Sequence, residues 1–202
     1  MSGAVPEPAV RLLEAGDAEA VAAVLADAFA TDPVMSWTLG GGGRAYRLFL
    51  ELARRIYLAR GFGHIVGDDA ATLWLPPGET AAPRLFDELG VAGAVLRAGG
   101  LKALMRGKTI GDIMAKHHPP RPHYYLFAVG VRDGRQGEGL GGRLIREGLA
   151  RADTEGVGAY LENSNPRNTP LYQRLGFAAT ALLPLPAGAP PLLAMLREPA
   201  AG

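Results

Sequence analysis

The order of the expected secondary-structure elements predicts a mixed α/β fold. Short apolar runs bounded by glycine, proline and aspartate predict strands, and apolar residues three or four positions apart predict helices between them. A nearly continuous apolar strand at 124–131 is followed by a glycine-rich loop, a helix at 140–154 and another strand at 159–162. These segments form a strand–helix–strand unit of about forty residues, which is typical of an α/β protein.

The remaining elements lie on both sides of this unit in the sequence. In chain order, the expected elements are a strand at 10–13, a helix at 18–30, a helix at 44–60, a hairpin formed by GHIVGD and ATLWLP, two or three short helices at 83–116, the unit at 124–162, a short helix at 169–175, and strands at 178–183 and 192–197.

Residues with strong turn and cap preferences mark the boundaries of these elements. Asp17 is a candidate N-cap for the first helix, and Gly176 is the expected C-cap of the last one. The Thr31-Asp32-Pro33 sequence ends the first helix, and a short VMSWTL stretch follows it. We interpret the glycines at 40–43 as a flexible loop, because no strand precedes them and they have no fixed partner.

Length and composition restrict the class of protein. A chain of 202 residues corresponds to about one domain, and its 48% hydrophobic content is sufficient for a core. The net charge of +1 gives no overall field that would recruit nucleic acid or an anionic membrane. The longest apolar run, at 89–96, is much shorter than the roughly 18 residues of a membrane span.

The absence of cysteine excludes disulfides, a cysteine nucleophile and thiolate metal clusters. The first ten residues contain neither a basic residue nor a hydrophobic block, so we expect no signal peptide. Both observations agree with a reducing compartment, and we expect a cytoplasmic location.

The loop at 136–142 has the composition of an anion-binding turn. Glycines allow the backbone N–H groups of a loop to approach a ligand closely, and the start of a helix attracts a pyrophosphate. Arg132, Arg135 and Arg143 would add positive charge around this loop. An ordinary glycine-rich turn remains the structural alternative.

A dinucleotide site is a second functional alternative for the same loop. Gly137, Gly139 and Gly142 fit the G-x-G-x-x-G pattern, and Glu162 follows 20 residues after the last glycine. However, residues 132–136 separate the strand from the glycines, where the dinucleotide fold requires a tight turn.

Two stretches of the chain carry a resemblance to a known family. VGVRDGRQGEGLG resembles the acyl-CoA-binding signature of the GNAT superfamily of N-acyltransferases, Q/R-x-x-G-x-G/A after a strand that ends in V-x-V. Gln136, Gly139 and Gly141 fill this signature after Val129 and Val131. AYLENSNPRNTPLYQRLGF resembles its second half, and the matching residues are Asn168, Tyr172, Gly176 and Phe177.

Three further stretches, AFATDPVMSW, ATLWLPPG and KHHPPRPHYYLFAVGV, resemble the branch that contains puromycin N-acetyltransferase and many bacterial relatives. The resemblance implies one N-acetyltransferase domain over 1–202, with an acyl-CoA-binding core at about 117–177 and substrate-covering segments at about 31–60 and 83–116. It also implies a mixed, mostly antiparallel sheet of six to seven strands, with splayed central strands and helices on both faces.

The resemblance further implies that acetyl-CoA is the co-substrate, that no metal is needed, and that a small-molecule primary amine attacks the thioester directly in a ternary complex. A protein or peptide N-acetyltransferase and a non-catalytic acyl-CoA-binding module are the alternatives. We expect neither nucleic acid nor membrane as a partner, and either a monomer or a homodimer. The implied acyl-CoA-binding residues are Val129, Gly130, Val131, Gln136, Gly137, Glu138, Gly139, Leu140, Gly141, Gly142, Asn168 and Tyr172.

Tyr172 and Glu162 are the candidate catalytic residues. A phenol with a pKa of about 10 is protonated at neutral pH and can donate to a departing thiolate, whose conjugate acid has a pKa of about 8.5. Glu162 could accept the proton of the amine directly or through water, or attract a cationic substrate. A solvated carboxylate at the end of a strand is the alternative for Glu162.

Histidines and aromatic residues supply further candidates. His117, His118 and His123 lack a metal-ligand spacing, so we predict no metal site, although one of them could tune the proton of the amine. By resemblance, four residues lie in segments that cover the acceptor pocket. These are Asp32, Trp37, Tyr46 and Trp74.

Overall fold

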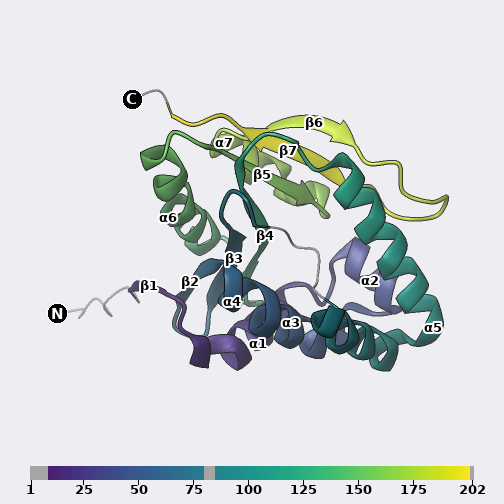
Figure 1. Cartoon of the computed structure of the whole chain (residues 1–202). Coiled ribbons are helices and arrows are strands. Elements are labelled where there is room, and N and C mark those ends of the chain that lie inside the picture. Colours follow the sequence, from purple (N-terminus) through teal and green to yellow (C-terminus); the bar gives the residue numbers. More distant parts are fainter. Residues whose placement is uncertain (1–8, 80–84, 201–202) are drawn as a thin grey trace.

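The computed structural model describes residues 9–79 and 85–200, so the chain start and the beginning of the segment expected to be helical from 83 lie outside it (Figure 1). Seven strands form one sheet with the order β1-β2-β3-β4-β5-β7-β6. The strands are β1 (Val10–Leu12), β2 (Phe62–Val66), β3 (Ala70–Leu75), β4 (His123–Val131), β5 (Gly158–Asn163), β6 (Ala178–Leu182) and β7 (Leu193–Arg197).

Helices connect these strands and cover both faces of the sheet. The α-helices are α1 (Ala18–Ala28), α2 (Pro33–Leu39), α3 (Tyr46–Leu52), α4 (Leu58–Arg60), α5 (Leu85–His117), α6 (Leu140–Thr154) and α7 (Thr169–Arg174). Short 3₁₀ turns are η1 (Ala15–Asp17), η2 (Gly42–Arg44) and η4 (Pro166–Asn168), and η3 (Ala53–Tyr57) is a π-helical turn. None of the described helices is long and apolar enough to cross a membrane.

The core is divided between the two faces of the sheet. On one face, Leu25 of α1 and Phe49 of α3 belong to a cluster that includes Tyr125 and Tyr160 of the sheet. On the other face, α6 and α7 cover a second cluster that includes Trp74. Figure 1 shows α6 on one side of the sheet and α1 and α3 on the other, which confirms the predicted layers.

All strand pairs are antiparallel except β4 and β5. The parallel pair is short, because it joins His123 to Gly158, Tyr124 to Ala159 and Tyr125 to Tyr160 and then ends. Beyond Tyr125 the two central strands no longer pair with each other. The predicted mixed sheet with splayed central strands is therefore confirmed.

Helix α2 lies where the sequence predicted only a short connecting stretch. Asp32 caps this helix, since its Oδ1 accepts a hydrogen bond of 2.8 Å from the backbone N–H of Met35. Pro33 occupies the first turn, and Gly40 ends the helix in a left-handed conformation with φ 76°. These are standard start and stop signals, so the sequence held enough information for this helix.

Two other expectations for the helices need correction. Asp17 stands at the N-cap of α1 without capping it, because its carboxylate accepts hydrogen bonds from the Arg11 guanidinium and the Glu14 backbone N–H. The helix expected at 44–60 is divided into α3, the π-helical η3 and α4. The predicted break within 83–116 is confirmed at Gly100, whose φ of 70° interrupts α5.

Helix α6 approaches the sheet closely at Gly148. A Cβ atom at this position would lie 2.4 Å from Cε2 of Trp74, which is fully buried in β3. The small residue therefore fixes the distance between α6 and the sheet, and with it the position of the loop at the start of the helix.

We predict that Gly148→Ala lowers the free energy of unfolding by about 1–3 kcal/mol, because the added methyl group overpacks against Trp74. Urea unfolding followed by circular dichroism measures this change. Gly111→Ala is the control, since Gly111 lies in α5 with no atom within 4 Å of an added Cβ. The control should gain stability from helix propensity. Equal stability gains in both variants would contradict the packing argument.

Candidate active site

The glycine-rich loop joins β4 to the start of α6. Gly134, Gly137 and Gly139 have φ values of 82°, 85° and 82°, a left-handed conformation that glycine adopts without strain. Gly139 is the N-cap of α6 and provides no side-chain cap for its first N–H groups. The loop therefore presents the positive end of a 15-residue helix dipole, where an anion binds favourably.

Glycines also allow the first turn of α6 to lie close to β4. A Cβ atom on Gly141 would be 3.3 Å from Cγ2 of Val131 and 3.7 Å from Cγ2 of Val129. Gly130 faces α1 instead, where a Cβ would meet Leu25 at 2.9 Å. The expected binding segment of β4 is thus enclosed by α6 on one face and α1 on the other.

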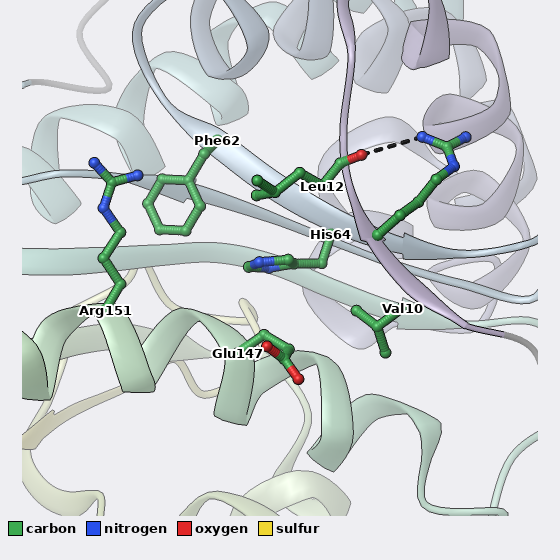
Figure 2. Close-up of a pocket in the computed structure, with 7 residues that line it drawn as sticks. Val10, Leu12, Phe62, His64, Glu147 and Arg151 are labelled. Carbon is green, nitrogen blue, oxygen red and sulfur yellow. Dashed lines mark hydrogen bonds between the residues drawn. The ribbon is translucent and has the colours of Figure 1, made fainter.

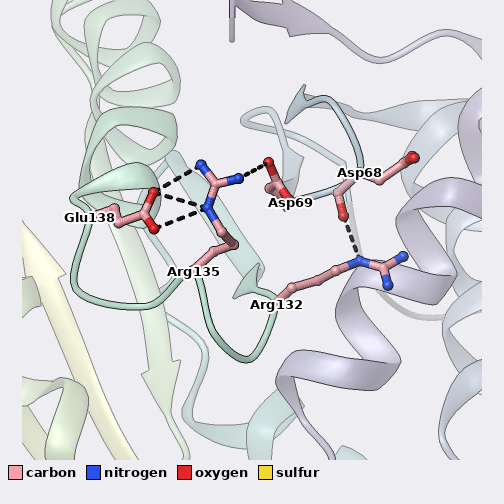
Figure 3. Close-up of polar contacts among 5 residues, drawn as sticks. All are labelled: Asp68, Asp69, Arg132, Arg135 and Glu138. Carbon is pink, nitrogen blue, oxygen red and sulfur yellow. Dashed lines mark hydrogen bonds and ion pairs between the residues drawn. The ribbon is translucent and has the colours of Figure 1, made fainter. Parts of the chain in front are cut away.

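The arginines near this loop hold it in place (Figure 3). Arg135 donates to Asp69 Oδ2 at 2.8 Å and to both carboxylate oxygens of Glu138 at 3.0 Å. Arg132 Nε donates to the backbone oxygen of Asp68 at 2.6 Å. The carboxylate of Glu138, followed by that of Asp69, raises the pKa of Arg135. Two carboxylates therefore compensate its charge, and the structure shows it joining the loop to the β2–β3 turn.

The divergence of β4 and β5 opens one edge of each strand. Residues 129–131 of β4 pair with β3 through Thr72, Ala71 and Ala70, while their opposite edge pairs with no strand of the described chain. On β5, the residues from Leu161 onward pair with β7 and not with β4. Backbone groups on the open edge of β4 are thus placed to hydrogen-bond a ligand that enters between the strands.

Glu162 lies in β5 beside this opening and is deeply buried. Its side chain is 2% exposed, and its Oε1 has no hydrogen-bond partner among the described residues. Burial, followed by the charge of Glu162, raises the pKa values of Tyr57, Tyr125 and Tyr160. The alternative of a solvated carboxylate at the strand end is therefore excluded.

A buried carboxylate oxygen without a hydrogen-bond partner is costly, and such groups concentrate at functional sites. The phenol groups around Glu162 come from separate parts of the chain, because Tyr57 ends the π-helical turn η3 while Tyr125 and Tyr160 lie on the two central strands. Sequence reasoning missed these tyrosines. A π-helical turn is itself a frequent mark of a functional site, but it was not visible in the sequence.

Tyr172 is buried in α7, with 7% of its surface exposed. Burial raises its pKa, and the charge of Asp32 raises it further. The phenol is therefore protonated at neutral pH and can act as a proton donor. The implied partner Asn168 stands at the N-cap of α7, where its side chain makes no cap hydrogen bond.

Asp32 lies beside the end of β5, although it is 132 residues away from Ser164 in the sequence. It is 5% exposed, and its Oδ2 accepts a hydrogen bond of 2.6 Å from the Ser164 hydroxyl. Asn163 Nδ2 donates to Thr169 Oγ1 at 2.9 Å, which ties β5 to the start of α7. Asn163 and Ser164 were not among the predicted site residues, since their partners lie on other elements.

The other expected acceptor residues occupy three different places. Trp37 is half-buried beneath the guanidinium of Arg106, which lies 4.2 Å from the ring centre. It lines a groove of about 480 Å³ between α2 and α5 that also includes Met105. Tyr46 is exposed at the start of α3, whereas Trp74 is fully buried on the α6 face. Trp74 thus has no accessible surface to offer a ligand.

A second cavity lies between α6 and the β1–β2 edge (Figure 2). It has a volume of about 350 Å³ and includes His64, Glu147 and Arg151 in its lining. Burial lowers the pKa of His64. Strands β3 and β4 separate this cavity from Glu162 on β5, so it is distinct from the opening between the central strands.

Among the described residues, no three His, Cys, Asp or Glu side chains are grouped so that they could hold a metal ion. The three candidate histidines do not all lie together. His117 Nδ1 hydrogen-bonds the carbonyl of Ile113 at 2.8 Å, whereas His118 and His123 contact each other.

A glycine-rich loop at a helix start, beside two splayed central strands, is an arrangement suited to binding an anionic ligand. The model of the acetyltransferase (GNAT) family matches residues 68–177. An uncharacterized N-acetyltransferase of Schizosaccharomyces pombe is 30% identical over 216 residues, covering 95% of this chain and 83% of that protein. The chain therefore belongs to the GNAT family and is an acyltransferase.

Solved structures agree with this assignment. One solved structure, described as histone acetyltransferase HPA2 and related acetyltransferase from Corynebacterium glutamicum, is 26% identical to this chain. Its TM-score is 0.72, and the match covers 97% of this chain and 98% of that one. The polyamine N-acetyltransferase of Drosophila melanogaster shares the fold, with 16% identity and a TM-score of 0.55 over 94% and 99% of the two chains. The more specific likeness to the puromycin N-acetyltransferase branch stays a prediction.

We predict that Asp69→Asn loosens the glycine-rich loop, because Arg135 loses one of its two carboxylate partners. Amide hydrogen exchange at residues 134–139 should become several-fold faster, while the free energy of unfolding changes by less than about 1 kcal/mol, as expected for a partly exposed ion pair. Asp68→Asn is the matched control in the same turn, since Arg132 binds the backbone oxygen of Asp68. Unchanged exchange in Asp69→Asn would show that the pair does not fix the loop.

Proposed function

We propose that the protein transfers the acetyl group of acetyl-CoA to a primary amine of a small molecule by direct attack in a ternary complex. The observation that carries this proposal is the buried carboxylate of Glu162 beside the opening between β4 and β5, whose Oε1 has no hydrogen-bond partner among the described residues. Tyr172, a phenol whose pKa is raised, supplies the complementary proton donor.

The chain around the opening fits acetyl-CoA, which supplies an activated acetyl group as a thioester. The left-handed glycines and the helix start without a side-chain cap form a cradle for a pyrophosphate. The open edge of β4 offers backbone groups to an extended arm. The residues proposed to hold it are Val129, Gly130, Val131, Gln136, Gly137, Glu138, Gly139, Leu140, Gly141, Gly142, Asn168 and Tyr172.

In this proposal Glu162 takes a proton from the ammonium form of the substrate, so that the amine nitrogen carries a free electron pair. The new bond joins this nitrogen to the acetyl carbon, and the bond from that carbon to sulfur breaks. Tyr172 donates its phenolic proton to the departing thiolate. Because Glu162 is buried, its charge is weakly screened and favours a cationic acceptor.

The acceptor we propose is an amine with an apolar body. Asp32 and Trp37 stay candidates for its contacts, because Asp32 lies near Tyr172 and Trp37 lines the groove beside α5. Tyr46 and Trp74 are left out of the proposed pocket, because Tyr46 is exposed at the start of α3 and Trp74 is fully buried on the α6 face. A panel of acceptors, including alkylamines, arylalkylamines, polyamines and a lysine peptide, distinguishes a small amine from a protein substrate.

We predict that Glu162→Gln lowers kcat by roughly 10²–10⁴-fold, since the amide cannot accept the proton of the amine. Release of the coenzyme A thiol, followed with a thiol reagent, measures the rate. Glu147→Gln is the control, because this exposed residue of α6 lies beside the separate cavity at the β1–β2 edge, and it should keep wild-type activity. Thermal unfolding of both variants checks the fold. Wild-type turnover by Glu162→Gln would rule out this residue as the base.

We predict that Tyr172→Phe lowers kcat by roughly 10²-fold and leaves the KM of both substrates within about twofold of wild type. The ring keeps its packing against Phe177, so only the hydroxyl group is lost. The loss should be smallest for acyl donors with an acidic leaving thiol, because these need less protonation. Tyr46→Phe is the exposed control. Calorimetric binding of acetyl-CoA without turnover of any amine would favour the non-catalytic module.

A further inference from the structure

Two histidines extend from Glu162 toward the surface. His118 follows the end of α5, and its Nδ1 lies 3.8 Å from Oε1 of Glu162. Its Nε2 lies 2.9 Å from Nε2 of His123, the first residue of β4. Nδ1 of His123 lies 2.7 Å from the backbone oxygen of Arg121. The three side chains and this carbonyl thus form a continuous series of polar contacts.

The carbonyl at the end of this series determines where the protons lie. Because the oxygen of Arg121 can only accept, Nδ1 of His123 must carry a proton. Burial lowers the pKa of His123, which favours the neutral ring, so its Nε2 is an acceptor. His118 must then donate from Nε2, and in its neutral form its Nδ1 presents an electron pair toward Glu162.

Exposure changes along the same series. The side chain of Glu162 is 2% exposed, whereas that of His118 is 31% exposed. The rings of Tyr125 and Tyr160 meet His118 edge-on, with centroids 4.9 Å and 5.0 Å away, and hold its ring in this orientation. His118 is therefore the member of the series that reaches solvent.

The charged and titratable groups around this pair are few among the described residues. Glu162, Tyr125 and Tyr160 face His118 from β5 and β4, and Arg121 lies beside His123. The charges of His118 and Arg121 disfavour a proton on His123, while the carboxylate of Glu162 favours one there. A proton that leaves Glu162 is thus directed to His118.

We propose that His118, oriented by His123, removes from Glu162 the proton that this carboxylate takes from the amine and releases it to solvent. This inference rests on the proposed function. The O–H bond of protonated Glu162 breaks, an N–H bond forms at Nδ1 of His118, and a proton then leaves the exposed ring to water. Glu162 is restored as a carboxylate for the next turnover. The 3.8 Å contact has the length of an ion pair, and contacts of this kind shorten when substrate binds.

His118 and His123 are therefore positioning residues that act through Glu162. His118→Ala should lower kcat about tenfold or more, which is less than the loss expected in Glu162→Gln, with the KM of each substrate within about twofold of wild type. Imidazole added to the assay should restore much of the lost rate in His118→Ala and none in Glu162→Gln.

His117→Ala is the matched control. This neighbouring histidine is exposed, and its ring bonds the end of α5 rather than the site. It should keep wild-type kcat with no response to imidazole. A kcat for His118→Ala within twofold of wild type overturns the relay. So does an equal loss in His117→Ala.

A second measurement does not depend on activity. Long-range ¹H–¹⁵N NMR of the ring nitrogens should show neutral His123 protonated at Nδ1, and this tautomer should persist in Glu162→Gln. A proton on Nε2 of neutral His123 overturns the assigned series, whether or not any variant folds poorly.

The outcomes separate the two proposals. If Glu162→Gln is inactive and His118→Ala is normal, the relay fails and the proposed function stands. If Glu162→Gln turns over like wild type, the assigned base fails and the relay fails with it.

Discussion

The short parallel pairing of β4 with β5 is the constraint on which the site depends. Hydrogen bonds join these strands at three residue pairs and then stop, so the neighbouring strands of a continuous sheet diverge within the core. Antiparallel partners hold the outer edges of both strands, because β3 pairs with β4 and β7 pairs with β5. The opening is therefore fixed by the sheet itself and does not require a mobile loop.

Burial affects both the proposed acid and the proposed base beside this opening. Glu162 and Asp32 are buried carboxylates, and both disfavour the ionisation of the phenols nearby. Tyr172 thereby keeps its proton, while Asp32 is satisfied by Ser164 and the N-terminus of α2. On Glu162, by contrast, Oε1 has no hydrogen-bond partner among the described residues. This difference is the reason that Glu162, and not Asp32, is the proposed proton acceptor.

Local signals made part of this arrangement predictable from sequence. Helix α6 and its glycine loop were predicted because left-handed glycines and a 3.6-residue apolar period are properties of a single segment. The partners of Arg135 and Asp32 were not, since Asp69 and Ser164 are 66 and 132 residues away from them. The position of Glu162 near the end of a predicted strand gave no indication that its side chain is buried. The residues that cover it come from η3 and from the segment after α5, which are distant in sequence.

The balanced net charge of the chain also has a structural explanation. A pyrophosphate site was expected to need nearby arginines, yet Arg135 is compensated by Asp69 and Glu138, and Arg132 holds a backbone oxygen. Of these two arginines, only Arg135 is thus compensated by carboxylates, while Arg132 keeps its charge beside the loop. Aligned peptide dipoles at the start of α6 add a positive field that is directional and confined to the first turn.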